Sequence, residues 1–192
     1  MEKIKIGHLI LGKSIGGVES DFSEFITYSY NDVTHYIISK SGLHPLVSNK
    51  VMNAVHKIYS LSHFANFRIP KFLIPIRTKY VIQRLKSLDI DVWLIWDTLP
   101  SLDLLTFISK AKIIFYERGK AWGKKTFKKK NYHLLLEKSN KIICAAKASK
   151  RMLELKLKVP GDKICVCLNA VRPSCKPVNV VTKNINKKKY LK

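Results

Sequence analysis

The chain has 192 residues, 46% of them hydrophobic and 26% charged, which excludes an intrinsically disordered chain and fits one domain with a tail. Its 36 Lys and Arg against 13 Asp and Glu give a formal charge of +23, so we expect an anionic partner such as phosphate, anionic lipid or nucleic acid. No run approaches the roughly 18 apolar residues of a membrane span, and no signal-peptide cleavage site follows the apolar start. The sequence therefore predicts a cytoplasmic protein.

Strand and helix signals alternate along the chain. Apolar, β-branched runs predict strands at residues 3–11, 33–39, 55–61, 91–96, 111–116, 141–145 and 163–168. Helical periodicity predicts helices at residues 18–30, 77–88, 101–109, 126–139 and 148–157. This alternation indicates an α/β fold with a doubly wound, mostly parallel sheet of about seven strands, whose ligands bind at the carboxyl ends of the strands.

Glycines follow the first predicted strand. Gly16 and Gly17 stand directly before the first predicted helix, whose free amides attract anions. The glycine spacing fits neither a dinucleotide fingerprint nor a Walker loop. A phosphate-binding loop and a simple tight turn both remain open.

Polar side chains follow two later strands. Glu117 and Arg118 come directly after an apolar strand and can act as a positioned carboxylate and an anion ligand, while Trp122 can stack on a sugar. A surface salt bridge with a core tryptophan is the alternative. Asp97 ends the fourth predicted strand and either caps the next helix, the commoner case, or faces the cleft.

The four cysteines are interpreted as reduced side chains without metal. No Cys-x-x-Cys pair is present, so zinc is not expected. Cys144, Cys165 and Cys167 lie in apolar, strand-like runs, where a thiol behaves as a small hydrophobe. No metal and no cofactor is therefore predicted.

Five stretches of the sequence carry a resemblance to a known family, namely Ile6–Ile10, Gly16–Glu19, Tyr116–Gly119 with Ala121–Trp122, Lys141–Ser149 and Val159–Val171. In this order they resemble the N-terminal domain of a family 4 glycosyltransferase of GT-B fold. The resemblance covers roughly residues 3–173. The resemblance implies a Rossmann-like acceptor-side domain at residues 1–172, followed by an interdomain linker or basic tail at residues 173–192.

The resemblance also implies a reaction and a site. Retaining enzymes of this family move a sugar from a nucleotide-sugar to an acceptor hydroxyl, commonly in bacterial surface polysaccharide or glycolipid assembly. By motif position, Gly16 and Gly17 are expected beside the donor diphosphate, and Glu117, Arg118, Asp97 and Trp122 in the acceptor pocket. The C-terminal donor-binding domain of the family is missing, so we expect a truncated chain that is inactive alone and needs that domain. A second chain that supplies this domain is an expected partner.

A basic segment between residues 64 and 86 contains no acidic side chain. Its cations alternate with aromatic and aliphatic residues, a pattern typical of a helix at an anionic membrane surface. The residues expected to face the membrane are Arg68, Lys71, Arg77, Lys79 and Arg84. A solvated surface is the structural alternative. Nucleic-acid binding, or a partner-dependent interaction protein without catalysis, is the alternative function, although no nucleic-acid motif is visible.

Overall fold

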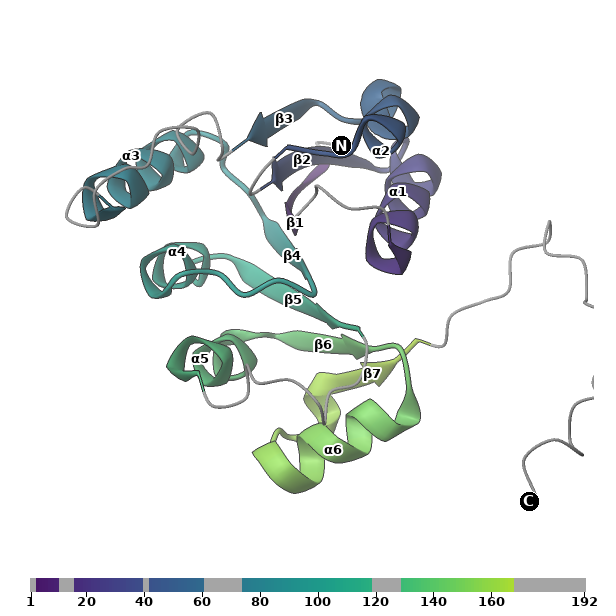
Figure 1. The fold of residues 1–192 in the computed structure, drawn as a ribbon, viewed down its shortest axis with the longest axis vertical. Helices are drawn as coiled ribbons and strands as arrows, with labels where there is room; N and C mark the ends of the chain where they lie inside the picture. Colours follow the sequence, from purple (N-terminus) through teal and green to yellow (C-terminus); the bar gives the residue numbers. More distant parts are fainter. Residues whose placement is uncertain (1–2, 11–15, 40–41, 61–73, 119–128, 168–192) are drawn as a thin grey trace, which may run out of the picture.

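The computed structural model describes residues 3–10, 16–39, 42–60, 74–118 and 129–167, in which strands and helices alternate (Figure 1). The strands are β1 (Ile4–Ile10), β2 (Val33–Ser39), β3 (Lys57–Ser60), β4 (Val92–Trp96), β5 (Lys112–Glu117), β6 (Lys141–Cys144) and β7 (Ile164–Val166). The helices are α1 (Gly17–Ser29), α2 (Pro45–Val51), α3 (Ile74–Lys86), α4 (Leu102–Ile108), α5 (Lys130–Lys138) and α6 (Lys147–Leu157), with 3-10 turns η1 (Met52–Ala54) and η6 (Gly161–Lys163).

All seven strands form one parallel sheet, which confirms the predicted fold class. Their order is β3-β2-β1-β4-β5-β6-β7. The chain therefore builds outward from β1 in one direction and from β4 in the other. In such a sheet, ligands bind outside the carboxyl ends of the strands at the point where the order reverses. That point is the boundary between β1 and β4.

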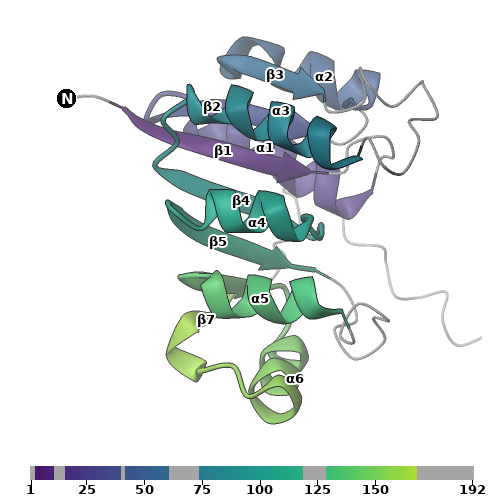
Figure 2. The same ribbon diagram turned by 90° about the vertical axis from the view of Figure 1, so that its left-hand side faces the viewer.

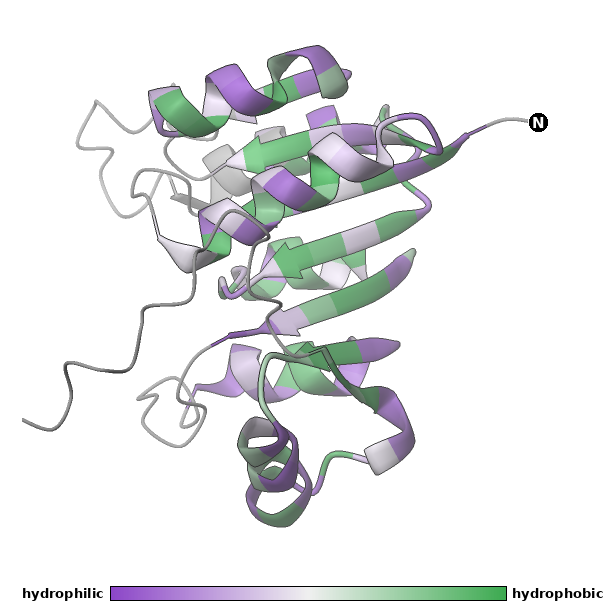
Figure 3. Ribbon diagram, turned by 90° about the vertical axis from the view of Figure 1, so that its right-hand side faces the viewer, coloured by the Kyte–Doolittle hydropathy of each residue, from purple (hydrophilic) through white to green (hydrophobic). Residues whose placement is uncertain are grey.

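Helices cover the two faces of the sheet unequally. The larger core cluster contains Leu85 of α3, Leu105 of α4, Leu135 of α5 and Leu153 of α6, so these four helices pack on one face. The other cluster contains side chains of α1 and α2. Figure 1 shows α3, α4 and α5 on one side of the strands and α1 and α2 on the other, and Figure 2 shows α3, α4 and α5 in front of the sheet. The strands between the helix layers are mainly hydrophobic, coloured green in Figure 3, as expected for a parallel sheet.

A close approach explains one glycine of β1. A Cβ on Gly7 would lie 2.7 Å from the ring of Trp93 on the neighbouring strand β4. Only a residue without a side chain fits there, because the indole fills the space beside the backbone.

One helix and several boundaries differ from the sequence predictions. Helix α2 was not predicted, because its apolar signal is reduced to Val47 and Val51, which are buried one turn apart after a proline at the helix start. Strand β3 is shorter than the predicted range 55–61. Helix α5 begins at Lys130, and the first residues of the range predicted for it, 126–128, lie outside the described residues.

The three cysteines that are expected to behave as small hydrophobes in apolar strands differ in their exposure. Cys144 on β6 is buried, whereas Cys165 and Cys167 are exposed. Strand β7 is the last strand of the described sheet, and of the described helices α6 packs on it, on the face of Ile164 and opposite Cys165.

Among the described helices, none is long and apolar enough to cross a bilayer. The predicted tail at residues 173–192 lies outside the described residues.

Candidate functional site

The carboxyl edge of the sheet at the β1/β4 boundary brings together residues from three segments. Gly16 and Gly17 begin α1, Asp97 follows β4, and Glu117 and Arg118 end β5. Strands β4 and β5 are neighbours, with Trp96 opposite Tyr116 in register. The residues predicted for the donor diphosphate and the acceptor pocket, as far as the structure describes them, therefore lie at one edge.

The first turn of α1 is capped by backbone alone. Gly16 is the N-cap residue in an extended conformation and makes no side-chain cap hydrogen bond. Its carbonyl accepts from the Ser20 amide at 3.1 Å. The first amides of a helix lack intrahelical acceptors and carry partial positive charge, so this turn favours an anion. Glu19 is buried in the same turn and places a carboxylate near that position.

Arg118 crosses from β5 to this first turn. Its Nη1 donates to the Gly17 carbonyl and to Oδ2 of Asp21 on α1. A Cβ on Gly17 would lie 2.5 Å from Nη2 of Arg118, so a glycine at this position permits the contact. The structure thus places Arg118 beside the glycines expected at the donor diphosphate. Its predicted role in the acceptor pocket stays a prediction.

Tyr116 and Asp21 complete this cluster. The Tyr116 hydroxyl donates to Asp21 Oδ2 at 3.2 Å. Burial, then the charge of Asp21, raises the pKa of Tyr116 to about 12. Tyr116 therefore stays protonated as a donor, and Asp21 holds both a phenol and a guanidinium. Sequence reasoning missed Asp21, because an acidic residue on a helix carries no signal of its own.

Glu117 lies on the opposite face of β5 from Arg118, since neighbouring strand residues alternate. It is fully buried, and the Tyr132 hydroxyl of α5 donates to its Oε2 at 2.9 Å. Burial, followed by the charge of Glu117, raises the pKa values of Tyr132 and of Cys144, the latter to about 12. Glu117 thus ties β5 to α5 beneath the edge, and its predicted acceptor role stays a prediction.

Asp97 does not cap the next helix. Ser101 does, because its side chain accepts from the Leu104 amide at 3.3 Å. Asp97 has a left-handed backbone with φ of 42°, and its amide donates to the Tyr116 carbonyl at 2.9 Å. This hydrogen bond extends the pairing of β4 with β5 by one residue and keeps Asp97 at the edge.

Several predicted residues lie away from this edge or outside the described part of the chain. Trp122, Arg68 and Lys71 fall outside the described residues, and the side chain of Arg77 is not described. Lys79 and Arg84 are exposed on α3, and the Arg84 guanidinium lies 5.7 Å from the centre of the Tyr80 ring.

A buried chain of hydrogen bonds lies behind the edge, between α1 and the sheet. Trp96 Nε1 donates to His8 Nδ1 at 3.1 Å, and His8 Nε2 lies 2.8 Å from His35 Nδ1. His35 Nε2 lies 3.2 Å from the Ser29 hydroxyl, which donates to the Phe25 carbonyl at 2.5 Å. The sequence did not predict these hydrogen bonds, because His8 and His35 each lie alone in an apolar strand.

The Trp96 indole fixes the direction of these hydrogen bonds. An indole N–H only donates, so His8 Nδ1 accepts and His8 Nε2 carries the proton, which it donates to His35. His35 then donates from Nε2 to Ser29. Burial, then the charge of His35, lowers the pKa of His8 well below its usual value, and burial lowers the pKa of His35 to about 4. Both imidazoles are neutral and link β4, β1, β2 and α1.

Among the described residues, no group of three or more His, Cys, Asp or Glu side chains is placed to hold a metal ion. The described edge holds the first backbone amides of α1 and the Arg118 guanidinium beside the carboxylates of Glu19, Asp21 and Asp97. The amides and the guanidinium suit a phosphate-bearing ligand.

Comparison with solved structures identifies proteins of the same fold. A glycosyltransferase from Rickettsia africae matches 90% of this chain at 22% identity and a TM-score of 0.65. The Anabaena protein HepE, solved with UDP and glucose, matches 88% of this chain at 10% identity and a TM-score of 0.59. A UDP-N-acetylglucosamine 2-epimerase matches 86% of this chain at 13% identity and a TM-score of 0.59. No protein-family description and no curated protein sequence matches the chain.

These neighbours share the Rossmann-like α/β fold of GT-B proteins, and the chain has that fold. The chain spans less than half the length of each of the three, 44%, 45% and 48%. At these sequence identities the likeness shows the fold alone. A function for this chain has to be argued from its own residues at the carboxyl edge of the sheet.

Proposed function

We propose that the chain is the acceptor-side part of a retaining glycosyltransferase, which moves a sugar from a nucleotide-sugar to an acceptor hydroxyl in surface polysaccharide or glycolipid assembly. One observation carries the proposal. Arg118 is held by Gly17 and Asp21 at the start of α1, beside the point where the strand order reverses. Neighbours of the same fold include a glycosyltransferase and a protein solved with UDP and glucose, which supports a nucleotide-sugar as the ligand.

The geometry suggests how the edge serves the reaction. The acceptor oxygen bonds to the anomeric carbon, the bond from that carbon to the nucleoside diphosphate breaks, and the proton of the acceptor hydroxyl passes to solvent. Negative charge grows on the departing diphosphate. The first amides of α1 and the Arg118 guanidinium are donors fixed where they stabilise that charge. Arg118 reaches a phosphate by exchanging its contact with Asp21, so Asp21 positions the guanidinium before the ligand arrives.

The acceptor and the membrane enter the proposal through other residues. Asp97 and Trp122 follow from motif position as acceptor contacts, together with Glu117. The exposed cations Lys79 and Arg84 on α3 support attachment to an anionic membrane surface. This attachment would bring the chain to a lipid-linked acceptor at the inner face of the cell membrane.

A sugar-transfer assay tests the proposal. We expect no transfer by the chain alone, and transfer from a nucleotide-sugar once a donor-binding domain is supplied in the same polypeptide or by a second chain. The variant Arg118→Ala should lower that transfer, whereas Lys156→Ala on the far end of α6 should not. Transfer by the chain alone contradicts the expectation of inactivity. Salt-sensitive binding to nucleic acid without nucleotide-sugar binding favours the alternative function.

A further inference from the structure

Helix α1 carries a carboxylate on the face that it turns to the sheet. The buried residues of this helix are Glu19, Phe22, Ser23 and Ile26, which recur at helical spacings of three, four and seven and therefore share one face. Phe22 and Ile26 on this face belong to the core that α1 forms with the sheet. Glu19 continues the face into the first turn, at the carboxyl edge, where its relative exposure is 7%. A charged side chain thus occupies a position that helical periodicity assigns to the core.

The Glu19 carboxylate has no hydrogen bond and no ion pair to any residue that the structure describes. Its Oε2 lies 3.0 Å from the point that a Cβ on Gly16 would occupy, so the group turns back over the N-cap residue. A glutamate at this third helical position commonly accepts from the N-cap amide in a capping box. Between the described residues Glu19 and Gly16 that hydrogen bond is absent. The usual structural role of a glutamate at this position therefore does not account for Glu19.

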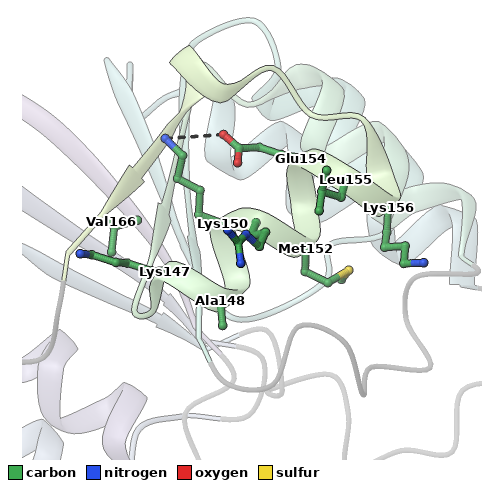
Figure 4. Close-up of a pocket in the computed structure, with 9 residues that line it drawn as sticks. Lys147, Ala148, Lys150, Met152, Glu154, Leu155, Lys156 and Val166 are labelled. Atoms are coloured by element: carbon green, nitrogen blue, oxygen red, sulfur yellow. Dashed lines mark ion pairs between the residues drawn. The ribbon is translucent and has the colours of Figure 1, made fainter.

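Two other carboxylates of the described structure show the usual pairing. The Tyr132 hydroxyl donates to buried Glu117. Glu154 lines a cavity of about 820 Å³ along α6 and lies 3.6 Å from Lys150 Nζ, the contact drawn as a dashed line in Figure 4. Burying a charge without a partner lowers stability, so such a group in a native fold calls for a ligand that supplies the partner. Glu19 is therefore a candidate binding group.

The neighbours of Glu19 narrow the chemistry of that partner. Glu19 lies over Gly16, and the Arg118 guanidinium lies against Gly17, so the carboxylate and the guanidinium flank the same two glycines. The first amides of α1 and Arg118 favour a phosphate. A carboxylate repels a phosphate but accepts from a hydroxyl group, and an O–H···O⁻ contact is among the stronger hydrogen bonds. A sugar that adjoins a diphosphate offers both groups at once.

We propose that Glu19 is a sugar-binding residue, whose carboxylate accepts a hydrogen bond from a hydroxyl group of a neutral sugar held beside the first turn of α1. The inference rests on the proposed function and adds to it a residue that contacts the sugar rather than the phosphates. The hydroxyl belongs either to the sugar of a nucleotide-sugar or to an acceptor sugar. The chemistry is the same in both cases, and the experiment separates the two sources.

Calorimetric titration with UDP and with UDP-glucose, with EDTA present to exclude divalent cations, tests the first source. The measured quantity is the ratio of the affinity for UDP-glucose to that for UDP. We expect Glu19→Met, which keeps the length of the side chain and removes the acceptor, to lower this ratio about tenfold or more, and Glu19→Gln to retain part of it. UDP affinity itself should stay the same or rise, because a negative group leaves the neighbourhood of the diphosphate. Glu24→Gln is the control on the same helix, where Glu24 pairs with Lys50, and it should change neither value.

Glucose without nucleotide tests the second source. It is titrated into the chain, and the amide resonances of residues 16–20 are followed. Shifts that vanish in Glu19→Met and persist in Glu24→Gln assign the hydroxyl to an acceptor sugar, whereas a change of the affinity ratio assigns it to the nucleotide-sugar. If neither the ratio nor the glucose shifts depend on Glu19, the inference is overturned. Absence of UDP and UDP-glucose binding by the wild-type chain refutes the proposed function instead, and the glucose titration then decides the inference separately.

Thermal unfolding without ligand distinguishes a binding role of Glu19 from a structural one. The cost of burying an unpaired carboxylate exceeds its attraction to the first amides of α1. Glu19→Met should therefore unfold at the same temperature as the wild type or a higher one, since its apolar side chain continues the face of Phe22 and Ile26. A lower unfolding temperature in both Glu19→Met and Glu19→Gln, together with an unchanged affinity ratio and unchanged glucose shifts, identifies Glu19 as a structural residue and overturns the inference.

Discussion

At the scale of the residue, Gly17 is the position where a single methyl group has the clearest consequence. In Gly17→Ala the new Cβ lies 2.5 Å from the Arg118 guanidinium, which must then leave the Gly17 carbonyl. We expect the free energy of unfolding to change by less than about 1 kcal/mol, because alanine favours the helix and offsets the lost contact. UDP affinity should fall about tenfold, or about 1.4 kcal/mol, in calorimetric titration.

A double-mutant cycle with Arg118→Ala gives this prediction its control. If Gly17→Ala acts through the guanidinium, it has little further effect once Arg118 is gone. Equal losses in both backgrounds would show that the methyl group disturbs the helix start itself.

The histidine pair predicts how stability depends on pH. The folded pKa values of His8 and His35 lie below the usual 6.5, that of His35 at about 4. Between the folded pKa values and 6.5, the unfolded chain binds more protons than the folded chain. The contribution of the two neutral histidines to the free energy of unfolding is therefore fully present above about pH 6.5 and is lost as pH falls towards 4. Urea denaturation should show a slope of up to about 1.4 kcal/mol per pH unit for each histidine.

A variant separates the pH dependence of stability that comes from the histidines from the part that comes from the carboxylates. His35→Gln keeps a donor for Ser29 and loses the group that titrates, so it should be less stable at pH 7.5 and show a shallower pH dependence. His133→Gln, an exposed control on α5, should retain the wild-type slope. If His35→Gln showed the same slope of stability with pH as the wild type, His35 would not be a source of the pH dependence.

At the scale of the element, the contact of Tyr132 with Glu117 fastens α5 to β5. Tyr132→Phe removes a 2.9 Å hydrogen bond to a fully buried carboxylate, so we expect a loss of about 1 to 3 kcal/mol in urea denaturation. Tyr116→Phe is the matched control, because its partner Asp21 is partly exposed, and it should cost about 1 kcal/mol or less. A larger loss for Tyr116→Phe would reverse this ranking of the two phenols.

Elements with a continuous apolar pattern were predictable, and those without one were not. Strand β4 reads Val-Trp-Leu-Ile-Trp and is buried on both faces, so its signal is strong. Helix α2 has seven residues, and its burial depends on one pair of valines, which gives no periodicity to detect. Cys165 looked like a core residue because the pattern of an edge strand resembles that of a central one. Whether a strand is at the edge depends on strand order, which local sequence does not specify.

The candidate site also has a part that the sequence predicts and a part that it does not. Gly16, Gly17, Glu117 and Arg118 were predicted at one edge, because they directly follow strands or begin a helix. The contact of Arg118 with Asp21 joins residues 97 positions apart and emerges only when α1 packs beside β5. The His8–His35 pair likewise depends on the register of two strands.

At the scale of the whole molecule, the charge of +23 predicts attraction to anionic surfaces. The double variant Lys79→Glu, Arg84→Glu lowers the charge on exposed positions of α3 by four. If α3 faces a membrane, it should weaken binding to phosphatidylserine vesicles more than the same reversal at Arg151 and Lys156 on α6. Vesicle cosedimentation measures this difference. Equal losses would indicate attraction by net charge rather than by α3.

The most direct test of the central claim is the effect of UDP on the backbone amide resonances of the chain. If the edge between β1 and β4 is the nucleotide-sugar site, UDP shifts the resonances of Gly16 to Glu19 and the side-chain resonance of Arg118, and these shifts persist in moderate salt. Changes confined to the lysine-rich segments, removed by salt and reproduced by nucleic acid, would contradict the claim.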